Sequence, residues 1–274
     1  MTAVGWRHIS SMPGCGRSNM ADLTLRGMVI RTVDYRDNDR ILTLFTAESG
    51  RVDAKARNCR KSTSPLLACT QPFTYGEYQL FYHKNKYIVD QGEVLESFYP
   101  LRDDVEKYAA ASLCAALCLE GVQAEESSEA IFSLLYHTLS FLTYGDCDPG
   151  DLSAAFLIRF LSLAGFRPAI TQCAVCGRDM RADPTIRFLP DRGGAVCAAC
   201  SPVGRKIGKT ALEVMRRMLL LDDDQLGRVK LKEPLRAEVL SHLIPYAKLY
   251  LPGVEKAAAL FTSLHMPLQA TEQE

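Results

Sequence analysis

Two pairs of cysteines with the same spacing constrain this chain more than any other feature. Cys173 and Cys176 form the first Cys-x-x-Cys pair, and Cys197 and Cys200 form the second, twenty residues further on. A Cys-x-x-Cys turn lets two thiolates reach one ion, and two such turns supply the four tetrahedral ligands that structural zinc takes. The pattern therefore predicts a zinc ion bound by these four cysteines.

Two other interpretations stay open at this point: a pair of disulfides, or four unrelated side chains. Zinc is favoured because the gap lies at the upper edge of the spacing expected for a zinc ribbon or knuckle, and residues 186–189 between the pairs have the composition of a short strand. Four thiolates leave no vacant coordination position, so we expect a structural rather than a catalytic ion. His137 and His242 stand far from the pairs, with no ligand-like spacing.

The composition is that of a globular protein without a targeting or membrane signal. The 274 residues carry 32 Lys and Arg against 32 Asp and Glu, and this net charge of zero argues against a basic footprint over the whole molecule. No run of about 18 apolar residues occurs, so we expect no membrane helix. Ten cysteines without an export signal predict a cytoplasmic protein. Residues 1–20 are predicted to be a disordered extension.

Residues 21–97 have the pattern of a small β domain. The runs are rich in β-branched and aromatic residues, Gly27 suggests a bulge or bend inside the first strand, and Asn85 lies in a predicted hairpin turn. Five strands in this length predict a closed barrel of the OB-fold class, which binds oligonucleotides. The predicted strands are 23–33, 40–46, 51–57, 73–82 and 87–95.

The rest of the chain is predicted to be mainly helical, which makes the fold class α+β. Asp103 or Asp104 is placed to cap a first helix, Ser127 and Ser128 precede a second, and Asp151 is expected to cap a third. Pro245 is expected to kink or split a later helix. The predicted parts are a helical domain at 98–172, an inserted zinc element at 173–204, and a second helical part with a tail at 205–274.

No catalytic motif is recognisable in the sequence. The stretch 204–210 contains Gly-Lys-Thr, but its upstream glycine is one residue too close for a phosphate-binding P-loop. There is no Gly-x-Ser-x-Gly elbow and no His-Glu-x-x-His helix. We therefore expect a protein that is not an enzyme.

A basic run at the end of the third predicted strand is the best candidate for binding a nucleic acid. Its cations can contact phosphates, and tyrosines on the same sheet can stack on bases where they are exposed. The alternative is a solvated strand edge with an ordinary aromatic core. The residues predicted to contact DNA are Arg51, Lys55, Arg57, Arg60 and Lys61.

Several stretches, taken in order, resemble the DNA repair protein RecO family. Residues 35–46 (Tyr-Arg-Asp-Asn-Asp-Arg-Ile-Leu-Thr-Leu-Phe-Thr) look like its signature, and Gln-Pro-Phe at 71–73 follows the basic loop. Gly-Phe-Arg-Pro at 165–168 then leads into the first cysteine pair. The match covers about residues 23–261. One departure is Asn58-Cys59, where the family often has Gly-Ala.

The resemblance implies a recombination mediator, associated with the nucleoid, that binds single- and double-stranded DNA and anneals complementary strands. It also implies work with RecR and single-strand-binding protein to help load RecA. The acidic tail of single-strand-binding protein ends in a hydrophobic residue, and a basic rim for it is expected at Arg159, Arg216 and Arg217. Two other classes stay open: a zinc-stabilised protein–protein adaptor whose barrel does not bind DNA, and an enzyme acting on nucleic acid through an unrecognised site.

Overall fold

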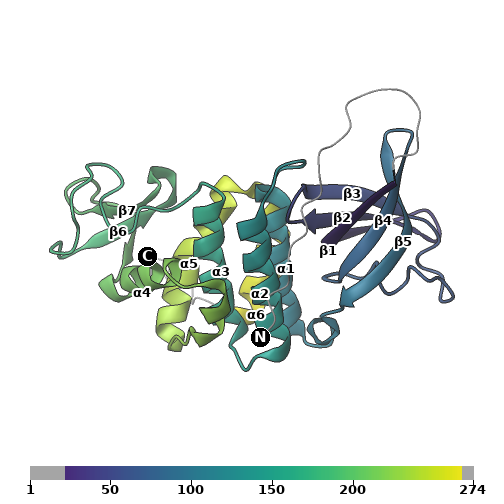
Figure 1. The fold of residues 1–274 in the computed structure, drawn as a ribbon. Helices are drawn as coiled ribbons and strands as arrows, with labels where there is room; N and C mark the ends of the chain where they lie inside the picture. The colour runs from purple at the N-terminus through teal and green to yellow at the C-terminus, as the bar shows by residue number, and fades with distance from the viewer. Residues whose placement is uncertain (1–21, 267–274) are drawn as a thin grey trace.

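The computed structural model describes residues 22–266, so the predicted N-terminal extension and the C-terminal tail from Pro267 lie outside the described residues. A β-barrel stands at one end of the molecule, a group of helices in the middle, and a small sheet carrying the cysteine pairs at the other end (Figure 1). No described helix is long and apolar enough to cross a membrane. The α+β fold class is confirmed.

The predicted five-stranded barrel is confirmed. Its strands close in the order β1-β2-β3-β5-β4, and β3 and β5 run parallel while the other pairs are antiparallel. This is the arrangement expected of an OB-fold. The strands are β1 (Asp22–Tyr35), β2 (Asp39–Thr46), β3 (Gly50–Ala56), β4 (Tyr75–His83) and β5 (Lys86–Glu96).

The irregularity in β1 does not fall where the sequence predicted it. The register against β2 shifts between Val29 and Arg31, whereas Gly27 pairs regularly with Gly76. A Cβ on Gly27 would lie 3.2 Å from the backbone oxygen of Phe45, so this glycine permits a close approach of two strands. Gly27 is therefore explained by the close packing of two strands rather than by a bulge.

The loop between β3 and β4 packs against the barrel interior. Cys59, Leu66 and Cys69 are buried in a core shared with Tyr78 and other side chains of the strands. The Tyr78 hydroxyl donates to the carbonyl oxygen of Cys69 at 2.7 Å and ties the loop to β4. The basic residues at the start of this loop are therefore held on an ordered segment rather than on a free one.

Six α-helices follow within the described residues. Asp104 caps the first as predicted, because its carboxylate accepts from the backbone N–H groups of Glu106 and Lys107. Pro245 lies inside one continuous helix and does not split it. The helices are α1 (Val105–Gly121), α2 (Glu129–Tyr144), α3 (Pro149–Leu163), α4 (Lys209–Leu219), α5 (Glu233–Tyr250) and α6 (Glu255–His265).

The cap of α3 was predicted at the wrong aspartate. Asp148 is the N-cap, and its side chain accepts from the N–H groups of Gly150 and Asp151. Asp151 lies in the first turn, where it is buried, accepts from the N–H of Leu231 at 2.9 Å and lies 3.6 Å from the Arg236 guanidinium. It joins α3 to α5 instead of starting α3.

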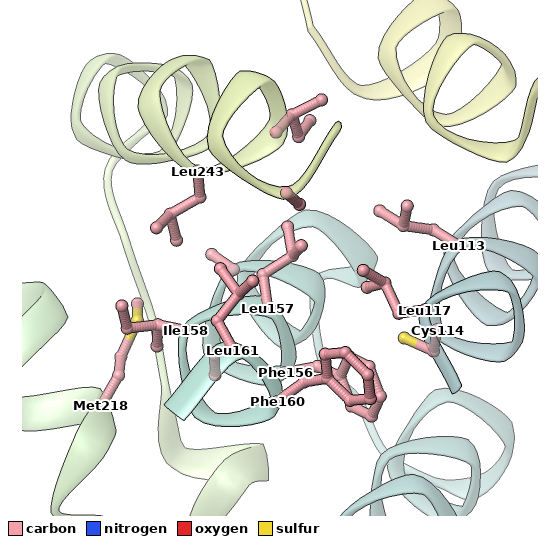
Figure 2. Close-up of a cluster of buried hydrophobic side chains, with 14 of the residues drawn as sticks. Leu113, Cys114, Leu117, Phe156, Leu157, Ile158, Phe160, Leu161, Met218 and Leu243 are labelled. Carbon is pink, nitrogen blue, oxygen red and sulfur yellow. The ribbon is translucent and has the colours of Figure 1, made fainter. Parts of the chain in front are cut away.

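The helices share one apolar core in which α3 is central. Figure 2 shows Leu157 and Leu161 of α3 between Leu243 of α5 and the side chains of α1. Phe156 and Phe160 stack with their ring centroids 5.7 Å apart. Cys114 and Cys118 on α1 are fully buried in this core. This core extends to the barrel on one side and to the cysteine-bearing sheet on the other.

The barrel and the helices are in direct contact. Phe45 of β2 meets Phe132 of α2 edge to face, with 5.4 Å between ring centroids. At Gly50 the backbone has φ of +59°, and a Cβ there would lie 2.1 Å from the carbonyl oxygen of Gln123. Only glycine fits this point of contact between the start of β3 and the segment after α1.

Candidate metal centre and nucleic-acid interface

The four predicted cysteine ligands converge on one point. The Sγ atoms of Cys173, Cys176, Cys197 and Cys200 all lie within 4.8 Å of one another, and those of Cys176 and Cys197 are 3.8 Å apart. Sulfurs at the corners of a tetrahedron with metal–sulfur bonds of about 2.3 Å are about 3.8 Å apart. The donor set and its geometry therefore fit a metal ion that takes four thiolates.

A small antiparallel sheet positions these cysteines. It is formed by β6 (Ile186–Leu189), as predicted, with β7 (Gly194–Cys197) and β8 (Arg205–Ile207) on either side. Cys197 ends β7, while Cys173 and Cys176 lie in a turn that Gly177 closes by donating to the Cys173 oxygen at 2.9 Å. Gly177 has φ of +73°, a conformation that favours glycine.

Neighbouring groups shift the pKa values of two of these thiols in opposite directions. Burial raises the pKa of the Cys173 thiol, but backbone N–H groups, with that of Cys197 first among them, outweigh burial and lower the pKa to about 6. Hydrogen bonding with the thiols of Cys176 and Cys197 raises the pKa of Cys200 to about 12. Four sulfurs packed this closely without a cation oppose one another's ionisation, and a divalent ion relieves that opposition.

Four of the five predicted DNA-binding cations lie close to the turn between β1 and β2. Lys55 pairs with Asp39 at 2.8 Å and lies 4.7 Å from the centre of the Tyr35 ring. Arg60 lies 3.4 Å from Asp34 and donates to the Asp37 oxygen at 3.2 Å. The backbone N–H of Asn58 donates to the Asp39 carboxylate at 2.8 Å, and that of Arg60 donates to the Asn38 carbonyl oxygen at 3.1 Å, so the loop is held against this turn.

Arg57 and Lys61 complete this group, and they differ from the first two in being unpaired. Both side chains are exposed, and neither forms an ion pair among residues 22–266. Asn58 between them adopts φ of +52°, which asparagine tolerates better than most residues. A left-handed backbone at position 58 and a buried side chain at position 59 both favour small residues. This explains why the RecO resemblance leads one to expect Gly-Ala at these two positions.

Arg51 has a different environment. Its guanidinium donates to the carbonyl oxygen of Leu119 on α1, and its side chain is half-buried between barrel and helix. Arg51 as a phosphate contact stays a prediction, but its charge is already engaged inside the chain. Sequence reasoning missed Arg36, which is exposed at φ of +55° in the β1–β2 turn and lies 5.4 Å from the Tyr35 ring centre.

The tyrosines of the barrel divide between surface and core. Tyr35 and Tyr82 are 39% and 45% exposed, so they are available for stacking. Tyr78 is fully buried, and burial raises its pKa strongly. Tyr87 lies 5.1 Å from Tyr82, ring centre to ring centre. The sequence did not predict which of these tyrosines are exposed.

The three arginines predicted for a partner tail do not form one cluster of free charges. Arg159 pairs with Asp223 at 2.7 Å and also donates to the Leu221 oxygen. Arg216 and Arg217 both pair with Glu213, at 2.7 and 3.1 Å. Arg216 is the one that borders a cavity.

That cavity, of about 80 Å³, lies between the cysteine-bearing sheet and α4. Four buried apolar side chains, Thr171 and three cations line it, and Arg216 is the only one of these cations that sequence reasoning named. The apolar wall consists of Ile170, Met180, Ile186 and Leu212, and the cations are Arg181, Lys209 and Arg216.

Comparisons with known proteins cover nearly the whole described chain. The family model for the N-terminal part of recombination protein O matches residues 20–98, and that for its C-terminal part matches residues 102–257. A curated DNA repair protein RecO of Symbiobacterium thermophilum is 34% identical over 231 residues, which is 83% of this chain and 91% of the relative. The RecO protein of Caldicellulosiruptor saccharolyticus is 30% identical over 235 residues, which is 85% of this chain and 94% of that relative. With its barrel, its helices and its cysteine pairs in this order, the chain belongs to the RecO family.

Proposed function

We propose that this protein is a non-enzymatic recombination mediator in DNA repair. It binds single- and double-stranded DNA, anneals complementary strands and, with RecR and single-strand-binding protein, helps to load RecA. Support comes from the family, whose curated members carry the name DNA repair protein, and from the OB-type barrel, a fold that commonly holds oligonucleotides. Its place of action is the nucleoid in the cytoplasm.

The observation that carries the DNA-binding proposal is the group of cations beside the β1–β2 turn. Lys55, Arg57, Arg60 and Lys61 come from the end of one strand and the loop after it, and this loop is ordered by its packing into the barrel. Arg57 and Lys61 are the main phosphate contacts, because they are exposed and unpaired within the described residues. Lys55 and Arg60 must first release carboxylates.

The proposed division into structural units follows the chain. The proposed units are residues 21–97 as the DNA-binding barrel, 98–172 and 205–274 as the helical domain with the C-terminal tail, and 173–204 as the inserted metal element; the tail from Pro267 lies outside the described residues. The insertion is proposed to bind structural zinc through Cys173, Cys176, Cys197 and Cys200, because four sulfur donors favour a soft or borderline ion. Zinc supplies a cross-link between two turns, and the four thiolates leave it no position for substrate.

The tail of single-strand-binding protein is proposed to bind at the cavity beside α4. Its apolar wall suits a terminal hydrophobic side chain, and Arg181, Lys209 and Arg216 suit the carboxylates around it. Arg217 lies one residue further along α4 and pairs with Glu213 outside the residues that line the cavity, and Arg159 is engaged with Asp223. A tail peptide should bind less tightly to Arg216→Ala, and binding unchanged by this substitution and by Arg181→Ala would refute the site.

A strand-annealing and DNA-binding titration at two salt concentrations tests the function as a whole. Phosphate contacts make affinity fall steeply with added salt, because bound counterions are released. A barrel that serves only as a protein–protein adaptor would give no annealing and no salt-dependent DNA binding. If labelled DNA is shortened or chemically altered after incubation with the protein, the protein is an enzyme instead.

A further inference from the structure

A groove of about 530 Å³ lies at the junction of the barrel and the helical part, apart from the cation group. The later half of the β3–β4 loop forms one wall with Leu67, and the end of β5 forms the other with Val94. Tyr99 and Arg102, in the short 3₁₀ helix η1 (Tyr99–Arg102), complete it. No acidic side chain lines this groove among the described residues.

Tyr99 is the one aromatic side chain among the described residues that line the groove, and it is held in place. It is 57% exposed, and the guanidinium of Arg102 lies 5.1 Å from its ring centre. Arg102 is itself fixed, because it donates to the carbonyl oxygens of Pro72 at 2.8 Å and Ser97 at 3.2 Å. A fixed, exposed ring beside a cation is suited to stacking on a flat π-system.

The groove continues from the proposed phosphate contacts along one ordered loop. The N–H of Lys61 donates to the oxygen of Asn58 at 3.2 Å, that of Ser64 to Lys61 at 2.9 Å, and that of Leu67 to Ser64 at 3.1 Å. Ser64 already lines the groove. One turn therefore separates the free cation Lys61 from Ser64 at the groove, and a second turn leads on to Leu67 in the groove wall.

From this arrangement we propose that the groove takes an unpaired nucleobase of single-stranded DNA, stacked on Tyr99, while Lys61 and its neighbours hold the adjoining phosphates. The proposal rests on the proposed DNA-binding function and predicts a preference for single strands. A duplex keeps its bases stacked inside, so it reaches the cations but not Tyr99. An acidic peptide is the competing occupant, and the continuity with the phosphate contacts favours DNA.

The test compares Tyr99→Ala, Tyr99→Phe and wild type for binding of a 20-residue oligothymidine and a duplex of the same length. Tyr99→Ala should weaken single-strand binding by about fivefold or more, the lower range for loss of one base–aromatic stack. Tyr99→Phe should bind like wild type. The slope of affinity against salt should stay unchanged, because no phosphate contact is lost. Tyr144→Ala, which removes a tyrosine 64% exposed on α2 outside the groove, is the matched control.

A photocrosslink gives a second readout that does not depend on a variant. An oligonucleotide carrying 5-iododeoxyuridine should crosslink to the peptide that contains Tyr99, and a crosslink confined to other peptides would overturn the proposal. An equal loss of single-strand and duplex affinity in Tyr99→Ala would also overturn it. The same holds if Tyr99→Ala loses binding to an acidic peptide without any loss of DNA binding.

The outcomes distinguish failure of this proposal from failure of the DNA-binding function on which it rests. If Arg57→Ala with Lys61→Ala weakens binding and Tyr99→Ala does not, the groove is wrong and the cation surface stands. If neither change affects binding, both the groove and the cation surface are wrong.

Discussion

Replacing Cys176 by serine isolates the contribution of the metal to stability. Cys176 is the exposed member of the four cysteines, so the substitution itself removes little packing. A serine hydroxyl is a poor substitute for a thiolate, and we expect the metal content to fall from one equivalent per chain toward zero. Metal binding in such elements is coupled to folding, so its loss should release the turns that hold β6 and β7.

The size of the effect follows from what the cysteine-bearing sheet buries. Phe188, Ile186 and Met180 are 2%, 5% and 2% exposed, and Phe188 packs against Tyr246 of α5 with 5.7 Å between ring centres. Full burial of such side chains is worth about 1.5–3 kcal/mol each. Their exposure would therefore cost up to about 5–9 kcal/mol, an upper estimate, which is comparable to the total stability of a typical protein.

Urea unfolding followed by circular dichroism, with metal content measured on the same sample, tests this reasoning. The variant should unfold at lower urea in its helical part and bind a dye for exposed apolar surface. The barrel should remain folded and keep its DNA affinity, because its interior core of Val29, Leu42 and Tyr78 is separate. Cys147→Ser, at a half-buried cysteine outside the metal site, is the control. Full metal content in Cys176→Ser, or lost metal with unchanged unfolding, would refute the account.

Two further predictions concern groups buried at contacts between elements. Burial, with the nearby Arg205, lowers the pKa of His242 from 6.5 to about 4. The stability that depends on neutral His242 is therefore fully present above pH 6.5 and is lost as pH falls toward 4. The loss in unfolding free energy is at most about 3 kcal/mol. His242→Phe should flatten the dependence of unfolding free energy on pH between 7 and 4, and an unchanged profile would assign the titration to another group. Arg51→Met should leave the Leu119 oxygen without this donor and lower the unfolding free energy by about 1–3 kcal/mol, which would be seen as a lower Tm. A normal Tm with a reduced salt slope for DNA binding would show that Arg51 contacts phosphates instead.

Local patterns in the sequence were sufficient where the cause of a structure is itself local. The spacing of the cysteine pairs predicted their convergence, β6 was placed at its observed bounds, and Asp104 was one of the two caps predicted for α1. Each of these depends on residues within one turn or one hairpin. The long strand runs also predicted the barrel, because five such runs of this length have few other ways to bury their apolar faces.

The errors arise from contacts between residues far apart in the chain. Asp148 and Asp151 are both suitable caps, and Arg236 and Leu231 on distant segments decide that Asp151 is buried. Likewise, Arg51 was predicted to contact DNA, but a carbonyl 68 residues away engages its charge. Pairwise contacts of this kind leave no mark in local periodicity.

The cation group beside the β1–β2 turn is where we propose that this protein holds DNA. The direct test is DNA affinity against salt for wild type and for a variant with Arg57, Arg60 and Lys61 all changed to Ala, each folded and carrying its metal. Each lost phosphate contact should lower the slope of log affinity against log salt by about one unit or somewhat less, and binding should weaken similarly for unrelated sequences, since phosphates carry no base information. A folded variant with wild-type affinity and slope would contradict the claim.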